Sequence, residues 1–178
     1  MRLRVGSHAP DFVATTVDGK TFALRDLNGQ PRLLSFYRYA SCPLCNVRLH
    51  ELLGRWPDYA KDGLLGISVF QSPPASVAMH MARHDAPFRL VPDPDEALYK
   101  LYGLESSVTA LLNPINLGKI FEASKLGYPQ KKIEGTKTRL PADFLIDKHG
   151  LVRELHYGKT LYDHIPYTVI ERFLATYR

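Results

Sequence analysis

The feature that most constrains this chain is its only pair of cysteines, Cys42 and Cys45, which stand where a strand-like run gives way to a helix-like one. Upstream, residues 31–37 form a short apolar and aromatic run, typical of a buried strand. Downstream, apolar residues recur at three- and four-residue intervals between 44 and 56, which gives one face of a helix. The sequence therefore predicts a dithiol on a strand-to-helix turn.

The predicted helix start gives Cys42 a reason to be reactive. A free thiol with a pKa of about 8.5 is mostly protonated at neutral pH, but a helix N-terminus or a nearby cation lowers that pKa. Pro43 suits the first turn, where its missing N–H costs nothing, and Arg38 lies four residues before Cys42. We expect Cys42 at the exposed N-terminal end of the helix, with unpaired amides pointing toward its sulfur. Cys45, one turn deeper, lies close enough to form a disulfide with it.

Composition limits the class of protein. A chain of 178 residues with 45% hydrophobic content can bury a full core, so we expect one domain spanning 1–178. The N-terminus lacks the apolar stretch of a signal peptide and no segment has the apolar length of a membrane span, so we expect a cytoplasmic protein with no membrane partner. A reducing cytoplasm disfavours a permanent disulfide and suits a cycling one.

The net charge of +5 raises the question of a nucleic-acid partner. Basic residues cluster between 125 and 139, but glycines and prolines interrupt the cluster and few aromatic residues are interleaved. A solvated loop explains this pattern better than a nucleic-acid surface, so we expect no nucleic-acid partner.

Strands and helices are predicted to alternate along the chain in an α/β arrangement. A short hairpin is expected over 11–17 and 20–24, around an Asp-Gly turn, and two parallel strands bracketing the dithiol helix make a right-handed βαβ unit. The expected later elements are the dithiol helix from 43 to Pro57, a strand at 64–70, a helix at 75–83, a strand at 88–91, a helix from Asp93 to Gly103, a hairpin over 142–147 and 151–156, and a last helix at 167–176.

The segment 105–139 is the hardest part to interpret. Its apolar residues suggest helical pieces broken near Pro114, followed by a polar loop, so it is expected to be a helical and loop insertion. It either covers the dithiol or forms a dimer contact, and the sequence does not separate these two roles.

These elements, in this order, resemble the thioredoxin fold, with a central mixed β-sheet flanked by helices, an N-terminal β-hairpin and a helical insertion before the last hairpin. The segments 6–12, 18–20 and 24–29 are similar to the opening of peroxiredoxins of the alkyl hydroperoxide reductase and thiol-specific antioxidant (AhpC/TSA) family. Phe36-Tyr37-Arg38 followed by Cys42-Pro43-Leu44-Cys45 resembles the peroxiredoxin-like subgroup.

The resemblance implies roles for three residues. Cys42 matches the attacking, peroxidatic cysteine, Cys45 the second cysteine of the pair, and Pro141 the cis-proline that faces the dithiol. An X-Pro bond adopts the cis form at a cost of only about 0.5–1 kcal/mol. An ordinary trans proline at the head of a strand is the alternative.

The chain also departs from the family pattern. Ser35 and Tyr39 stand where typical members carry a proline and a threonine or serine. The late arginine that polarises the peroxide aligns closest to Pro141, so Arg38 or Arg139 is expected to replace it. Tyr39 is a candidate hydroxyl donor over the thiol.

Two mechanisms follow from the resemblance. In the first, the Cys42 thiolate reduces a hydroperoxide and becomes a sulfenic acid, and Cys45 condenses with it; in the second, Cys42 attacks a protein or glutathione disulfide and Cys45 resolves the mixed disulfide. The peroxidase is favoured because the N-terminal hairpin belongs to that branch. Either mechanism needs no cofactor and uses an external thiol reductant (thioredoxin, glutaredoxin or glutathione), and a homodimer is possible.

Other interpretations use the same thiols without redox chemistry. Cys42 and Cys45 with His80 and His84 would supply two sulfur and two nitrogen ligands for tetrahedral zinc, although their spacing is far longer than in zinc fingers. The cysteines could also be two buried small apolar residues, or the protein a binding module with an inert dithiol.

Overall fold

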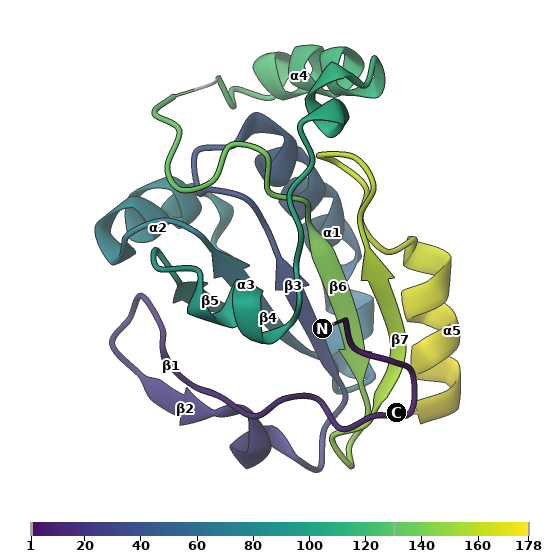
Figure 1. Ribbon diagram of the computed structural model, residues 1–178. Helices are drawn as coiled ribbons and strands as arrows, with labels where there is room; N and C mark the ends of the chain where they lie inside the picture. Colours follow the sequence, from purple (N-terminus) through teal and green to yellow (C-terminus); the bar gives the residue numbers. More distant parts are fainter. Residues whose placement is uncertain (1, 130, 178) are drawn as a thin grey trace.

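The computed structural model describes residues 2–129 and 131–177, and it places a five-stranded sheet at the centre (Figure 1). The strands lie in the order β5-β4-β3-β6-β7. β3, β4 and β5 are parallel, whereas β6 runs antiparallel to both β3 and β7, so the sheet is mixed as expected. The strands are β3 (Arg32–Phe36), β4 (Leu65–Phe70), β5 (Arg89–Pro92), β6 (Ala142–Ile146) and β7 (Val152–Tyr157).

A separate antiparallel hairpin precedes the sheet, and it confirms the expected N-terminal hairpin. It pairs β1 (Val13–Thr15) with β2 (Thr21–Ala23). The helices are α1 (Pro43–Lys61), α2 (Pro74–Met81), α3 (Ala97–Leu101), α4 (Ile115–Lys125) and α5 (Tyr167–Tyr177). Across residues 2–129 and 131–177, none of the helices has both the length and the apolar character that crossing a bilayer requires.

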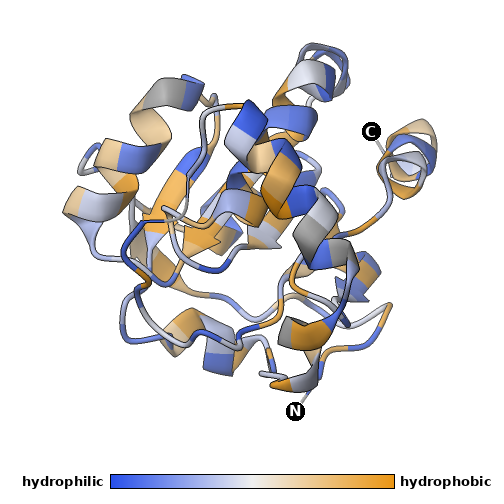
Figure 2. Cartoon of the chain, turned by 90° about the horizontal axis from the view of Figure 1, so that it is seen from above, coloured by the Kyte–Doolittle hydropathy of each residue, from blue (hydrophilic) through white to orange (hydrophobic). Residues whose placement is uncertain are grey.

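The sheet separates two apolar cores, and the strands are largely hydrophobic (Figure 2). Because side chains alternate along a strand, Leu33 of β3 faces one core and Leu34 the other. The first core is completed by α1, α2 and α5, and the second by α3 and the N-terminal segment. Every residue of β3 is buried, as a central strand covered on both faces requires.

The end of β3 determines where the dithiol lies. Beyond Phe36, the backbone continues beside β4, with the Tyr37 N–H donating to the Val69 carbonyl at 2.9 Å and the Gln71 N–H donating to the Arg38 carbonyl at 2.9 Å. The chain then turns into α1, which packs against the first core. The expected strand, turn and helix around the dithiol are therefore confirmed.

Two predicted helix boundaries were wrong. α1 continues past Pro57 to Lys61, although an interior proline costs about 3 kcal/mol. The buried Trp56 packs its ring 4.3 Å from that of Phe88, and contacts of this kind offset the cost. α3 begins at Ala97 rather than near Asp93, whose carboxylate instead caps the later start by accepting the N–H groups of residues 97 and 98.

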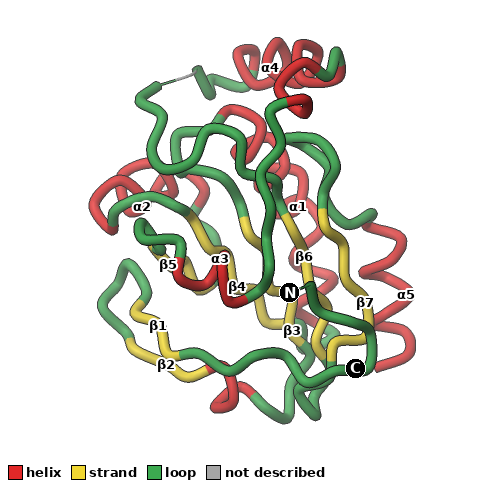
Figure 3. Tube along the Cα trace, in the orientation of Figure 1, coloured by secondary structure: helices red, strands yellow, loops and turns green. Residues whose placement is uncertain are grey.

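The segment 105–139 contains the expected helical pieces. A 3₁₀ turn over Thr109–Leu112 precedes the break at Pro114, and α4 follows and lies against α1. Between α4 and β6, residues 126–129 and 131–141 form turns and loop with one isolated bridge from Arg139 to Ser106, and the chain passes across the end of the sheet where α1 begins (Figure 3). We call residues 131–139 of this connection the cover segment.

The packing around Gly66 of β4 gives a test of the first core, to which Trp56 and Phe88 belong. A Cβ built there would lie 2.9 Å from Cη2 of Trp56 and would also clash with the Phe88 ring. We expect Gly66→Ala to lower the free energy of unfolding by about 1–3 kcal/mol through overpacking. The control is Gly54→Ala on α1, where a Cβ meets nothing within 4 Å and helix propensity should add about 1 kcal/mol. Urea denaturation midpoints measure both, and equal midpoints would contradict the described packing.

Candidate active site

The turn that carries the dithiol is fixed by its own hydrogen bonds. Cys42 is the N-cap of α1 and Pro43 is the first helical residue. The Asn46 side-chain amide donates to the carbonyls of Ala40 at 2.9 Å and Cys42 at 2.8 Å. The Ala40 N–H in turn donates to the Ser72 hydroxyl at 2.9 Å. The turn is therefore tied to the helix that follows it and to the loop after β4.

Hydrogen-bond donors converge on the two sulfur atoms. Nη1 of Arg38 donates to Sγ of Cys42 at 3.5 Å, and the backbone N–H of Arg38 donates to Sγ of Cys45 at 3.4 Å. Cys42 also accepts hydrogen bonds from the Cys45 thiol and from the backbone N–H groups of Leu44 and Cys45 at the helix N-terminus. The expected amides and cation are thus both at the Cys42 sulfur.

This arrangement separates the pKa values of the two thiols. Burial raises the pKa of Cys42, but the hydrogen bond from Cys45, the positive charge of Arg38 and the backbone N–H groups outweigh it, and the pKa falls from 9.0 to about 6. Burial and the neighbouring Cys42 sulfur raise the pKa of Cys45 well above its ordinary value. These opposite shifts favour a Cys42 thiolate that accepts a hydrogen bond from a Cys45 thiol.

The prediction that Cys42 is exposed was wrong. Its side chain is 0% exposed and that of Cys45 is 2% exposed. The cover segment lies over the turn, because the Ser41 hydroxyl donates to the Lys132 carbonyl at 2.7 Å and Nη2 of Arg38 donates to the Lys137 carbonyl. Of the two roles left open for 105–139, the structure shows the covering one.

Side-chain contacts hold the cover segment in place. Gln71 donates to the Thr136 carbonyl at 2.9 Å and accepts the Thr136 N–H at 3.2 Å, while the Thr136 hydroxyl donates to the Glu96 carboxylate at 2.6 Å. Gly135 has a φ of +65°, and a Cβ there would lie 2.9 Å from Cδ of Gln71. A glycine is therefore required both by the backbone conformation and by the close approach to Gln71.

The two arginines considered at the sequence level occupy different places. Arg139 forms an ion pair with Glu96 and donates to the Leu104 carbonyl at 3.1 Å, so its guanidinium supports the cover segment. Of these two arginines, only Arg38 donates a hydrogen bond to a cysteine sulfur among the described contacts. The Arg38 guanidinium also lies 5.1 Å from the centroid of the Tyr39 ring. The Tyr39 side chain is 1% exposed and packs beside the dithiol cluster.

Pro141 does not have the expected cis conformation. No peptide bond in residues 2–129 and 131–177 is cis, so the Leu140-Pro141 bond is trans. The Pro141 carbonyl accepts the Gly158 N–H at 2.9 Å, which continues the pairing of β6 with the β7 side of the sheet. The trans form is the favoured one for an X-Pro bond, and this extended approach to β6 accommodates it.

Sequence reasoning missed a buried polar cluster beneath the site. The Asp143 carboxylate on β6 accepts hydrogen bonds from the Ser35 hydroxyl at 2.6 Å and the Ile165 N–H at 2.8 Å, and it contacts Nδ1 of His164 at 2.9 Å. Burial raises the pKa of Asp143, but His164 and its other partners outweigh this and lower it. The Tyr37 ring lies 5.1 Å from that of His164. The sequence signal that could have revealed this cluster is Asp143 itself, a charged residue within the otherwise apolar strand β6.

The zinc hypothesis is not supported. Nε2 of His84 is 2.8 Å from Oδ1 of Asn46, and its ring stacks 5.3 Å from that of Tyr128. In the part of the chain that the structure describes, no three His, Cys, Asp or Glu side chains are gathered to hold a metal ion. Among the described residues, the two histidines, 80 and 84, therefore do not join the cysteines in a ligand set, and the geometry does not support this alternative.

Comparisons with known proteins find similar chains among peroxiredoxins and thiol-disulfide oxidoreductases. A protein of Mycobacterium tuberculosis that carries a peroxiredoxin name is 28% identical over 102 residues, which is 57% of this chain and 65% of that protein. The thiol-disulfide oxidoreductase ResA of Geobacillus thermodenitrificans is 28% identical over 137 residues, 76% of this chain and 72% of ResA. The crystal structure of peroxidoxin BcpB from Mycobacterium tuberculosis superposes with a TM-score of 0.69 at 16% identity, covering 98% of this chain and 96% of BcpB.

The structural match confirms the thioredoxin-like fold expected from the order of elements. The sequence profile of the AhpC/TSA family matches residues 5–155, which includes the hairpin, the dithiol turn and most of the central sheet. This chain therefore belongs to the AhpC/TSA family.

Proposed function

We propose that this protein is a thiol peroxidase that reduces small hydroperoxides with Cys42 and resolves the product with Cys45. The observation that carries the proposal is the convergence of donors on the two sulfurs, with Nη1 of Arg38 3.5 Å from Sγ of Cys42 and the backbone N–H of Arg38 3.4 Å from Sγ of Cys45. These contacts favour a thiolate at Cys42 and a thiol at Cys45, because the pKa of Cys42 is lowered and that of Cys45 is raised. The nucleophile and the resolving group of a peroxidase need these two states at the same pH.

In the first step, the Cys42 thiolate attacks the terminal oxygen of the peroxide. The S–O bond forms as the O–O bond breaks, the sulfur is oxidised to a sulfenic acid, and the leaving alkoxide takes up a proton to become an alcohol. Nη1 of Arg38, 3.5 Å from the sulfur, is positioned to stabilise the negative charge that moves onto the departing oxygen.

In the second step, the Cys45 thiol attacks the sulfenic sulfur, and water leaves as the disulfide forms. An external thiol reductant of the thioredoxin, glutaredoxin or glutathione type then supplies two electrons and one net proton, which restores the Cys42 thiolate and the Cys45 thiol. The sequence separation of three on a helix start places Cys45 one turn from Cys42, so this step needs little rearrangement.

The covered site favours a small oxidant over a bulky one. Both sulfurs are buried, so substrate reaches them only when the cover segment opens. A hydroperoxide needs a smaller opening than a protein disulfide does. This difference supports the peroxidase as the leading function.

A thiol-disulfide oxidoreductase is the second candidate. A cysteine pair at a helix start with one ionised and one protonated thiol also suits attack on a disulfide, and ResA is among the similar proteins. In that reaction Cys42 forms the mixed disulfide and Cys45 releases the reduced product.

The proposal extends to the setting of the reaction. We propose that residues 1–178 act as one domain in the cytoplasm, where reduced thiols regenerate the pair. A homodimer stays a prediction, to be tested by the solution mass of the purified protein.

Replacing Cys45 separates the two functions. We expect Cys45→Ser treated with micromolar hydrogen peroxide to accumulate a Cys42 sulfenic acid within seconds, because no resolving thiol remains; mass spectrometry after dimedone labelling detects it. Cys42→Ser is the control and should stay unlabelled. If Cys45→Ser gives no sulfenate but forms a mixed disulfide with oxidised glutathione, the reductase replaces the peroxidase.

Replacing Arg38 tests the source of the thiolate. The wild-type ultraviolet thiolate signal should rise as pH increases through about 6, since Cys42 is protonated and unreactive below its pKa and ionised above it. Arg38→Met should move this midpoint upward and slow peroxide reduction at neutral pH by about tenfold or more. Arg55→Met, an exposed arginine of α1, is the control. An unchanged midpoint in Arg38→Met would refute the assigned role.

Loosening the cover segment should make brief opening more frequent and so raise access to Cys42, while the closed form still predominates and keeps the thiolate surroundings unchanged. Thr136→Ala removes the hydrogen bond to Glu96, which should raise the rate of iodoacetamide labelling at Cys42 by up to about tenfold for a bond worth about 1.5 kcal/mol. The thiolate midpoint should not move. Thr176→Ala, which removes a hydroxyl bond on α5, serves as the control. Equal labelling rates in the two variants would show that the cover segment does not control access.

A further inference from the structure

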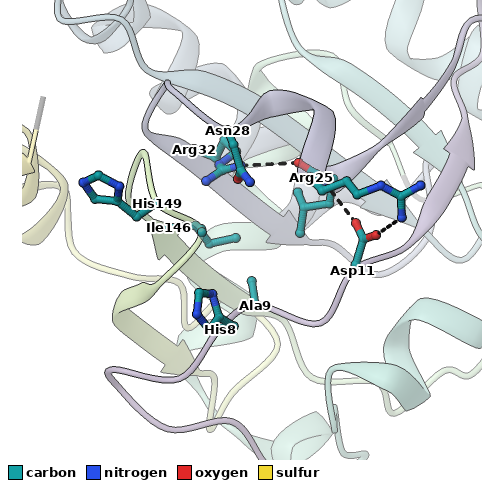
Figure 4. A pocket seen from close by; sticks show the side chains of 10 residues that line it. His8, Ala9, Asp11, Arg25, Asn28, Arg32, Ile146 and His149 are labelled. Carbon is teal, nitrogen blue, oxygen red and sulfur yellow. Dashed lines mark hydrogen bonds and ion pairs between the residues drawn. The ribbon is translucent and has the colours of Figure 1, made fainter.

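A cavity that several polar side chains border lies at the end of the sheet opposite the dithiol. It has a volume of about 300 Å³ and lies between the N-terminal segment, the 3₁₀ turn over Leu24–Leu27, the start of β3 and the turn between β6 and β7. Figure 4 shows His8 and His149 on one side, the Arg25–Asp11 pair on the other, and Arg32 beside Asn28. The proposed redox chemistry uses none of these side chains.

Arg32 brings a buried positive charge to this cavity. Its side chain is 0% exposed, and its guanidinium donates to the Leu24 carbonyl at 3.3 Å, to Oδ1 of Asn28 at 2.8 Å and to the Asp147 carbonyl. Each of these acceptors is neutral. Nε of Arg32 is buried and has no hydrogen-bond partner among the described residues.

The two carboxylates near Arg32, those of Asp147 and Asp11, form their hydrogen bonds and ion pairs with other groups. The Asp147 carboxylate accepts Nε of Arg153 at 2.6 Å and the N–H groups of His149 and Leu151, so it acts on Arg32 only through space. Asp11 pairs with Arg25 on the rim of the cavity. Within the described part of the chain, the charge of Arg32 therefore lacks a hydrogen-bonded counterion, which is a costly arrangement for a buried guanidinium.

Gly150 keeps the cavity open. Its φ is +83°, and a Cβ there would lie 3.4 Å from Oδ1 of Asn28 and 3.8 Å from Nδ1 of His8. A side chain would thus fill the space between these polar groups. With glycine in place, Asn28, His8 and His149 border the same space as Arg32.

We propose that this cavity binds the phosphate group of a small phosphate monoester or inorganic phosphate. A dianion there gives Arg32 the counterion that the protein does not supply, and the asparagine amide and the two imidazoles provide further N–H donors to its oxygens. The Arg25–Asp11 pair leaves the rim near neutral, so the buried guanidinium is the dominant charge. The site is independent of the dithiol and of the proposed function.

The test uses the intact protein and two probes, inorganic phosphate and glycerol 3-phosphate. Each is titrated at constant ionic strength against amide resonances in a ¹⁵N–¹H NMR spectrum. We expect saturable shifts at Ala9, Asn28 and Gly150, with sodium chloride producing none. Tighter binding of glycerol 3-phosphate identifies a monoester site, whereas equal or tighter binding of inorganic phosphate identifies a phosphate site.

Variants assign the binding to the proposed residues. The exposed pair His8→Ala and His149→Ala, made together, should weaken phosphate binding at least tenfold, while His50→Ala on α1 should leave it unchanged. Arg32→Gln should abolish the shifts, and its amide spectrum shows whether it is folded. Should it fail to fold, the histidine variant carries the test. The absence of saturable shifts in the wild-type protein, or equal binding by the histidine variant and its control, would overturn the proposal.

Discussion

The contact between the Arg38 guanidinium and the Cys42 sulfur is the interaction on which the site depends. A thiolate placed in a dry interior is unstable unless a cation and oriented N–H groups replace the water it has lost. The fold provides these groups from two adjoining pieces of chain, the extension of β3 that carries Arg38 and the first turn of α1. The Cys42 sulfur can therefore be both fully buried and ionised.

The same guanidinium also joins the charge of the sulfur to the closure of the site. One of its nitrogens contacts Cys42 and another donates to the Lys137 carbonyl of the cover segment. Opening the cover segment therefore removes a partner from the group that stabilises the thiolate, and admits water to its surroundings. The opening that the proposed reaction requires would therefore change access to the sulfur and the electrostatics of the sulfur together.

Local pattern was enough to predict the parts of the fold that local interactions determine. The hairpin around Asp18, the central strand and the start of α1 at Pro43 all follow from turn chemistry and periodicity. The burial of Cys42 depends on backbone about ninety residues later in the chain, and the Asp143–His164 contact joins β6 to the segment before α5. Neither contact could be predicted, because the residues around one partner carry no information about where the other partner lies. Tertiary packing likewise overrides the helix-breaking tendency of Pro57.

The cover segment also bears on how the protein would survive an excess of oxidant. In the proposed reaction, a newly formed sulfenic acid has two fates, condensation with Cys45 or attack on a second peroxide that carries it irreversibly to the sulfinic state. Condensation needs only a neighbour one helical turn away, whereas the second oxidation needs another molecule to pass the closed segment. Enclosure thereby favours the disulfide, which can be reduced again, over the sulfinic acid, which cannot. A catalyst with such a covered site would admit substrate more slowly but would resist inactivation by its own substrate.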